Sequence, residues 1–271
     1  MRKTIEFLAV VAIVWCLFGV AILLFQGSGT VGSKPSISAP QDVLEVSVKD
    51  KEDVLLEDVT AEDAEDGNLN TSVFVESISP FDEEQCRTVT YAVFDSDDNL
   101  SQTTRRIKYK DYEAPKLILK KSLDDSVAYD ATQIFNYFGA KSSVDGDISG
   151  KVLISNINYA EDTYSFTASV TDSCGITSQL RFNVKQQMSY PTMEIILTDY
   201  LIYVQKGKSI DPKDYLESVT QGNVENKEAL ENVSVIDNYN ANEPGMYEFV
   251  YEVQGSGTNY GTSTLYVVVE E

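Results

Sequence analysis

The chain has 271 residues, with 43 acidic side chains against 21 basic ones and no histidine. A formal charge of −22 repels polyanions, so nucleic acid is excluded as a partner. The lack of histidine removes Ser-His-Asp and Cys-His catalysis and histidine-metal sites, and we expect no enzymatic activity.

The N-terminus is expected to cross a membrane. Residues 7–25 are apolar and uncharged, and Arg2 and Lys3 precede them. At about 1.5 Å per residue, a helix over this segment spans the roughly 30 Å hydrocarbon layer. The positive-inside rule leaves residues 1–6 in the cytoplasm and the C-terminal part outside. The alternative is a cleaved signal peptide, whose apolar region is usually shorter. We therefore expect a single-pass protein of the cell membrane.

A Gly/Ser-rich linker, residues 26–34, follows the anchor. Three segments then share one pattern, residues 87–109, 164–184 and 247–269, in which two alternating apolar and polar runs flank a short turn. This pattern predicts a β-hairpin. The copies recur about every 80 residues, a spacing that suits small β-sandwich domains. The spacing and the breaks near Pro115 and Pro191 predict the domain ranges 35–113, 114–190 and 191–271.

Shorter elements are expected between these hairpins. Apolar runs predict strands near residues 43–48, 73–78 and 152–157, and single helical turns are expected at residues 132–138 and after Pro212. No repeat holds two cysteines, so an intradomain disulfide is excluded and structural thiols are expected.

The first repeat carries a recognisable pair of motifs. Residues 61–69 read AEDAEDGNL, and residues 88–95 read TVTYAVFD before a second strand. Together they resemble bacterial cell-surface immunoglobulin-like domains of the DUF5011 and HYR-like type. The resemblance is weaker in the second repeat and weakest in the third. It implies a β-sandwich fold and an extracellular setting, and it does not imply an enzymatic activity. Together with the repeats and the N-terminal segment, we expect a mostly β protein: three tandem immunoglobulin-like β-sandwiches preceded by one transmembrane helix.

Two acidic segments of the first repeat are candidates for a Ca²⁺ site. Calcium prefers six to eight oxygen ligands, many of them carboxylates. Loops at one end of a sandwich could bring these two segments together, and the candidate ligands are Asp63, Asp66, Asp95 and Asp97. The alternative is that Asp and Gly here supply turn geometry. No other cofactor is expected.

Most of the tyrosines lie in alternating runs and are expected to pack in cores. Tyr159, Tyr239 and Tyr260 lie in turn-like surroundings and are candidate contact residues. Three functions stay open: binding or adhesion to an extracellular protein, a structural stalk without a ligand, and carbohydrate binding. The first predicts an exposed apolar or aromatic patch. The second predicts uniformly acidic faces, and the third predicts coplanar exposed tyrosine rings.

Overall fold

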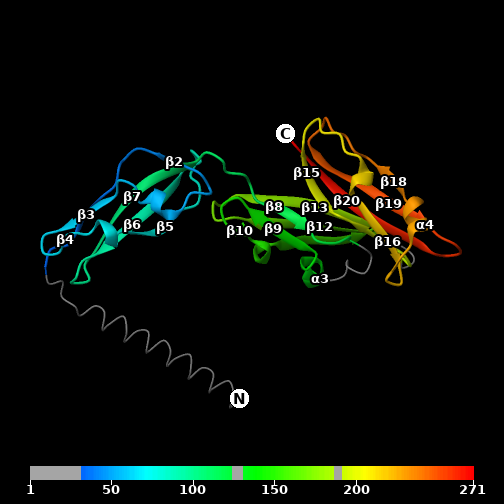
Figure 1. Ribbon diagram of the computed structural model, residues 1–271, viewed down its shortest axis with the longest axis horizontal. Coiled ribbons are helices and arrows are strands. Elements are labelled where there is room, and N and C mark those ends of the chain that lie inside the picture. The colour runs from blue at the N-terminus through cyan, green and yellow to red at the C-terminus, as the bar shows by residue number, and fades with distance from the viewer. Residues whose placement is uncertain (1–31, 124–130, 186–190) are drawn as a thin grey trace, which may run out of the picture. The chain divides into compact units, whose positions relative to one another are not determined.

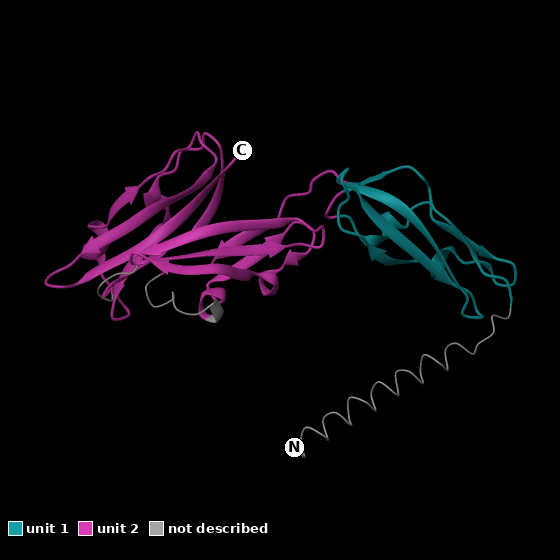
Figure 2. Cartoon of the chain, turned by 180° about the vertical axis from the view of Figure 1, so that it is seen from behind, with its two compact units in different colours: residues 1–46, 50–108 teal, residues 47–49, 109–271 magenta. Residues whose placement is uncertain are grey.

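The structure is a computed structural model that describes residues 32–123, 131–185 and 191–271 (Figure 1). The described chain is mostly β, as expected, and its strands form several sheets. It divides into two compact units (Figure 2): unit 1 comprises residues 1–46 and 50–108, and unit 2 comprises residues 47–49 and 109–271. Each unit is described by itself.

Unit 1 holds the first repeat as two sheets. One sheet has the order β1 (Ser36–Ser38), β3 (Thr60–Asp63), β4 (Gly67–Asn68), and the other has the order β2 (Leu44–Val46), β7 (Leu100–Tyr109), β6 (Arg87–Phe94), β5 (Phe74–Ile78). Val89, Tyr91 and Val93 of β6 are fully buried, as strict alternation requires. The Tyr91 hydroxyl donates to the Leu55 carbonyl (2.7 Å) at the end of the short helix α2 (Glu52–Leu55). A 3₁₀ turn, η1 (Asn70–Ser72), precedes β5.

Unit 2 holds the second and third repeats. The sheets of the second are β8 (Lys116–Leu119), β9 (Phe138–Ser142) and β10 (Gly146–Asp147), and β11 (Leu153–Ala160), β12 (Thr163–Thr171) and β13 (Thr177–Lys185). Those of the third are β14 (Glu194–Leu197), β16 (Leu216–Gln221) and β17 (Val224–Glu225), and β15 (Leu201–Gln205), β20 (Tyr260–Glu270), β19 (Gly245–Gln254) and β18 (Ser234–Asp237). The helical turns are α3 (Ala131–Phe135), η3 (Ser149–Lys151), η4 (Pro212–Tyr215) and α4 (Lys227–Glu231).

All three predicted hairpins are confirmed. They are the antiparallel pairs β6–β7, β12–β13 and β19–β20, and their last paired residues are Phe94 with Leu100, Thr171 with Thr177, and Gln254 with Tyr260. The helical turns expected near residue 132 and after Pro212 are α3 and η4, where the Asp211 carboxylate accepts the Lys213 N–H. The last residue pair of each hairpin gives an equivalent position in every repeat, so residues can be compared between repeats.

The second and third repeats, expected as the domains 114–190 and 191–271, each have a core cluster of their own and pack against each other within unit 2. Leu265 and Val267 of β20 point into the third repeat, while Tyr266 between them is also buried and packs against the core of the second. Its ring meets Phe182 edge-on, with centroids 5.0 Å apart. The Leu117 N–H also donates to the Tyr203 hydroxyl (3.0 Å). A strand that buries both of its faces joins the two repeats.

The expected anchor at residues 7–25 lies outside the described residues. Within the ranges that the structure describes, no helix is both long enough and apolar enough to span a membrane. The two cysteines in those ranges, Cys86 and Cys174, are buried and are not joined in a disulfide.

Candidate functional sites

The two acidic segments of unit 1 meet, as expected. Asp63 ends β3, and its Oδ1 accepts the backbone N–H groups of Glu65 (2.8 Å) and Asp66 (3.0 Å). Asp66 Oδ2 accepts the N–H of Ser96 (2.7 Å), in the turn between β6 and β7. The Asp66 and Glu65 amides hold the pKa of Asp63 below its ordinary value. One carboxylate therefore shapes the first turn, and another ties that turn to the hairpin.

Asp95 organises the hairpin turn itself. Its Oδ1 accepts the N–H groups of Asp97 (2.9 Å) and Asn99 (2.7 Å), and its Oδ2 accepts the Asn99 side-chain amide (2.8 Å). Asp97 is exposed, and its carboxylate lies beside Gly32 so closely that a Cβ there would stand 2.7 Å from Oδ2. Asp95 is therefore engaged with backbone and amide donors of its own turn.

The second repeat reproduces these bonds. Asp145 Oδ2 accepts the Ser173 N–H (2.7 Å), as Asp66 does from Ser96. Asp172 Oδ1 accepts the N–H groups of Cys174 and Ile176 (2.9 and 3.1 Å). Burial alone would raise the pKa of Asp145, but the bonds from Ser173 and the charge of Lys151 outweigh it and lower the pKa. A bond that recurs at corresponding positions favours a structural role in the sandwich.

These bonds bear on the calcium hypothesis. Among the residues that the structure describes, no group of three or more Asp, Glu, Cys or His side chains could hold a metal ion. In the two acidic turns of unit 1, the buried oxygens Asp63 Oδ2 and Asn99 Oδ1 have no hydrogen-bond partner among the described residues. A calcium site at Asp63, Asp66, Asp95 and Asp97 stays a prediction, and the hydrogen bonds favour turn geometry instead.

The three candidate contact tyrosines lie on different elements. Tyr159 of β11 is 47% exposed, and its ring lies 4.4 Å from that of Tyr164 at an angle of 32°. Tyr239 follows β18, donates its hydroxyl to the Lys208 carbonyl, and packs against two aromatic rings. Tyr260 begins β20, and its carbonyl accepts the N–H groups of Thr192 and Met193. The three tyrosines therefore lie in three different surroundings and do not form one cluster.

A different set of side chains forms an exposed cluster on unit 1. Phe74, Phe94 and Leu100 are 39%, 47% and 36% exposed, on the outer face of the sheet β2-β7-β6-β5. The two phenyl rings are nearly parallel (12°), with centroids 6.1 Å apart. Ala92, the strand partner of Phe74 on the same face, is fully buried. We name Phe74, Phe94 and Leu100 the aromatic patch.

The fold does not require apolar side chains at these positions. Phe94 and Leu100 correspond to Thr171 and Thr177 in the second repeat. The third repeat has Gln254 and Tyr260 there. Alternation alone could not reveal this patch, because aromatic residues are ordinary in strands. Comparing the last pair of each hairpin would have revealed it.

Acidic residues lie next to the aromatic patch, in the turn after β6 and on β5. Asp97 and Asp98 are exposed in the adjacent turn, and Glu76 on β5 accepts a hydrogen bond from Gln102. The arginines of β7 are engaged elsewhere: Arg105 is buried and pairs with Asp42 (3.3 Å), and Arg106 pairs with Asp82 and Glu84. The surface around the patch is therefore apolar at its centre and negative at its rim.

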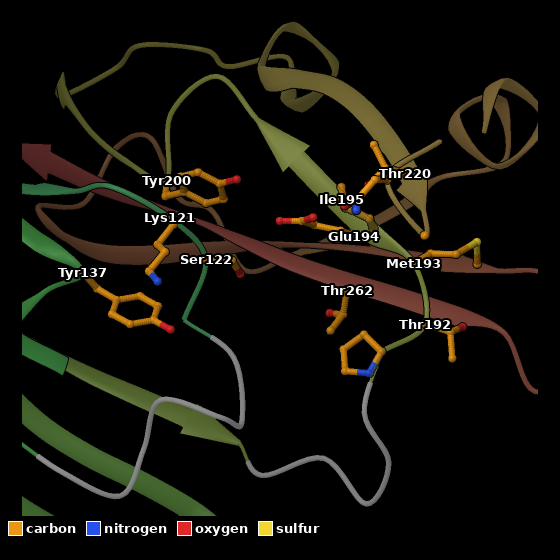
Figure 3. A pocket seen from close by; sticks show the side chains of 13 residues that line it. Lys121, Ser122, Tyr137, Thr192, Met193, Glu194, Ile195, Tyr200, Thr220 and Thr262 are labelled. Atoms are coloured by element: carbon orange, nitrogen blue, oxygen red, sulfur yellow. The ribbon is translucent and has the colours of Figure 1, made fainter. Parts of the chain in front are cut away.

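Unit 2 contains an open pocket of about 450 Å³ where the second and third repeats meet (Figure 3). Tyr137 and Tyr200 contribute aromatic rings to its wall, and Lys121 Nζ lies 3.8 Å from the centre of the Tyr137 ring. Glu194, at the start of β14, extends its carboxylate toward the side where Lys121 and Tyr200 lie. Burial, and then the nearby Glu194, raise the pKa of Tyr200.

No known protein family matches the sequence, and no curated protein does. Among solved structures, the chain is similar to a Clostridium perfringens ZmpB structure containing the M60 catalytic domain with CBM51-1 and CBM51-2 (12% identity, 87% of this chain and 31% of that chain, TM-score 0.24). It is also similar to human CDH23 EC21-23 (12% identity, 87% and 100%, TM-score 0.23). The chain thus spans about a third of the ZmpB structure. Nothing about a ligand or partner follows from similarities at this level.

Proposed function

We propose that the chain is a non-enzymatic surface protein, anchored by residues 7–25, that binds an extracellular protein through the aromatic patch of unit 1. The observation that carries the proposal is the exposure of Phe74, Phe94 and Leu100 side by side on one sheet face. Contiguous exposed apolar surface in a soluble domain is typical of interaction sites. A stalk without a ligand would need no such patch, and the corresponding pairs in the other repeats lack it.

Charge indicates the kind of partner. Large apolar side chains at the centre of an interface supply most of the binding energy, and the rim steers association. Glu76, Asp97 and Asp98 make the rim of this patch negative. The partner is therefore a protein segment with apolar side chains flanked by lysine or arginine. A second copy of the chain fits poorly, because pairing patch to patch would oppose like charges.

An array of defined peptides that vary in apolar content and charge tests this proposal. The full chain should be retained by peptides that combine aromatic or aliphatic residues with Lys or Arg, less so at high salt. A variant with Phe94→Thr and Leu100→Thr carries the side chains of the second repeat and should lose retention while remaining folded. Leu153→Ser is a matched control, because Leu153 is 67% exposed at the position in β11 that corresponds to Phe74. Equal retention of the double variant and the wild type would contradict the proposal.

The surface location is tested separately. Externally added protease should degrade residues 32–271 in intact cells, while a tag before residue 1 stays protected. Protection of the C-terminal part in intact cells would count against an outward orientation.

A further inference from the structure

The pocket of unit 2 is lined by aromatic rings together with hydroxyl, amide and charged groups. Its lining includes the rings of Tyr137 and Tyr200, the hydroxyl groups of Thr220 and Thr262, and the amide of Asn223. Figure 3 shows the two tyrosines and the two threonines. We propose that this pocket binds a neutral sugar, such as the terminal residue of a glycan. This proposal concerns unit 2 alone and does not depend on the aromatic patch.

The aromatic rings suit one face of a sugar. A pyranose ring presents C–H groups on one face and hydroxyls around its edge, so it packs on an aromatic side chain while its edge seeks hydrogen bonds. Tyr200 provides one such ring, and Tyr137 provides a second, one face of which is covered by Lys121 Nζ at 3.8 Å from the ring centre. Small-molecule sites commonly combine aromatic walls with a few convergent polar groups, and a pocket of about 450 Å³ is within their usual range.

The charged groups favour a neutral ligand. Lys121 is a donor and Glu194 an acceptor, and within the described part of the chain neither joins a salt bridge. One positive and one negative group on the same pocket leave no net charge to attract an anion or a cation. Sugar hydroxyls both donate and accept, so they can use both groups, as well as the amide of Asn223.

Other ligand classes fit less well. A metal ion would find a single carboxylate, Glu194, among the side chains of the pocket wall. A nucleotide phosphate would meet one lysine in a chain of formal charge −22. An apolar ligand would leave Lys121, Glu194 and the surrounding hydroxyls without partners, which is costly on burial.

Hydrogen bonds within the third repeat hold one side of the pocket wall in place. Thr192 and Met193 lead into β14, and their N–H groups donate to the Tyr260 carbonyl of β20 (2.9 and 3.0 Å). Gly261 permits this approach, because a Cβ there would lie 2.7 Å from the Met193 carbonyl oxygen. The Tyr200 hydroxyl accepts the Leu197 N–H (3.3 Å). A preformed wall spares the ligand the cost of ordering it.

Binding of the full chain to an array of neutral glycans, followed by calorimetric titration with the best-bound free monosaccharide, tests this site. Glu194→Ala should weaken the monosaccharide about tenfold or more, because it removes a charged hydrogen-bond partner. Lys121→Ala should weaken it as well. Glu231→Ala is the matched control, since Glu231 is an exposed carboxylate in α4 of the same repeat.

Three outcomes would overturn the proposal: no neutral glycan retained, retention of anionic glycans only, or unchanged affinity in Glu194→Ala. Thr220→Val is a second variant in case Glu194→Ala lowers the melting temperature. The Phe94→Thr, Leu100→Thr variant should bind the sugar normally. Loss of peptide binding with sugar binding retained, or the reverse, therefore separates the two sites.

Discussion

Removing the Tyr266 ring should uncouple the second and third repeats. The side chain is 2% exposed, lies in the core of the second repeat, and packs on Phe182. Truncating a buried aromatic residue to alanine costs about 3–5 kcal/mol. For a unit of this size, each kcal/mol lowers the melting temperature by about 2–4 °C, so Tyr266→Ala should lower that of unit 2 by roughly 6–20 °C.

Calorimetry of the full chain measures this effect. Because Tyr266 lies where the two repeats meet, its loss should also split the transition of unit 2 into two. Tyr159→Ala is the control, since Tyr159 is half-exposed in the same unit and should cost only about 1 kcal/mol. A double-mutant cycle with Phe182→Leu should give a coupling of about 0.5–1.5 kcal/mol. The reasoning is refuted if Tyr266→Ala is no more destabilising than Tyr159→Ala.

Three further predictions concern ionisable groups. Asp145→Ala should lower the free energy of unfolding in urea by about 1–3 kcal/mol at neutral pH. The folded-state pKa of Asp145 is lowered, so its contribution is present above about pH 4 and is lost as the pH falls. A difference between variant and wild type that persists in acid would contradict this. Burial is the main cause that raises the pKa of Tyr203 to about 12, so unit 2 should lose stability as the pH rises from about 10. A Tyr203→Phe variant whose unfolding free energy falls with pH as steeply as that of the wild type would count against this. If the aspartate turns are structural, millimolar Ca²⁺ should leave the melting temperature of unit 1 unchanged; a rise that Asp63→Asn abolishes would instead establish the calcium site.

The hairpins and the aspartate turns could be predicted because local pattern determines them. Alternation in residues 87–94 places Val89, Tyr91 and Val93 inward, and the structure buries all three. The turn geometry weighed for Asp66 is what the structure shows: its carboxylate accepts a backbone N–H, and so does that of Asp145 in the second repeat. These carboxylate–backbone hydrogen bonds join residues a few positions apart or in adjacent turns, so the spacing of the aspartates in the sequence indicates them.

The packing of the second repeat on the third and the two proposed binding surfaces depend on contacts that spacing does not encode. Tyr266 looks like any outward position of β20 until the second repeat covers it. Phe94 looks like an ordinary strand residue until its exposure is known. Tyr137 and Tyr200 come from different repeats and line one pocket only because those repeats pack together. Tyr239, a candidate chosen from turn-like surroundings, donates its hydroxyl to the Lys208 carbonyl, a partner that its surroundings in sequence do not indicate.

The central claim is that the aromatic patch binds a basic, apolar protein segment. Its most direct test is the Kd of the best-retained peptide for the wild type, the Phe94→Thr, Leu100→Thr variant and the Leu153→Ser control. Aromatic side chains at the centre of an interface contribute about 2 kcal/mol or more, so the double variant should bind at least about 30-fold more weakly while the control binds like the wild type. A double variant that keeps the wild-type Kd would contradict the claim.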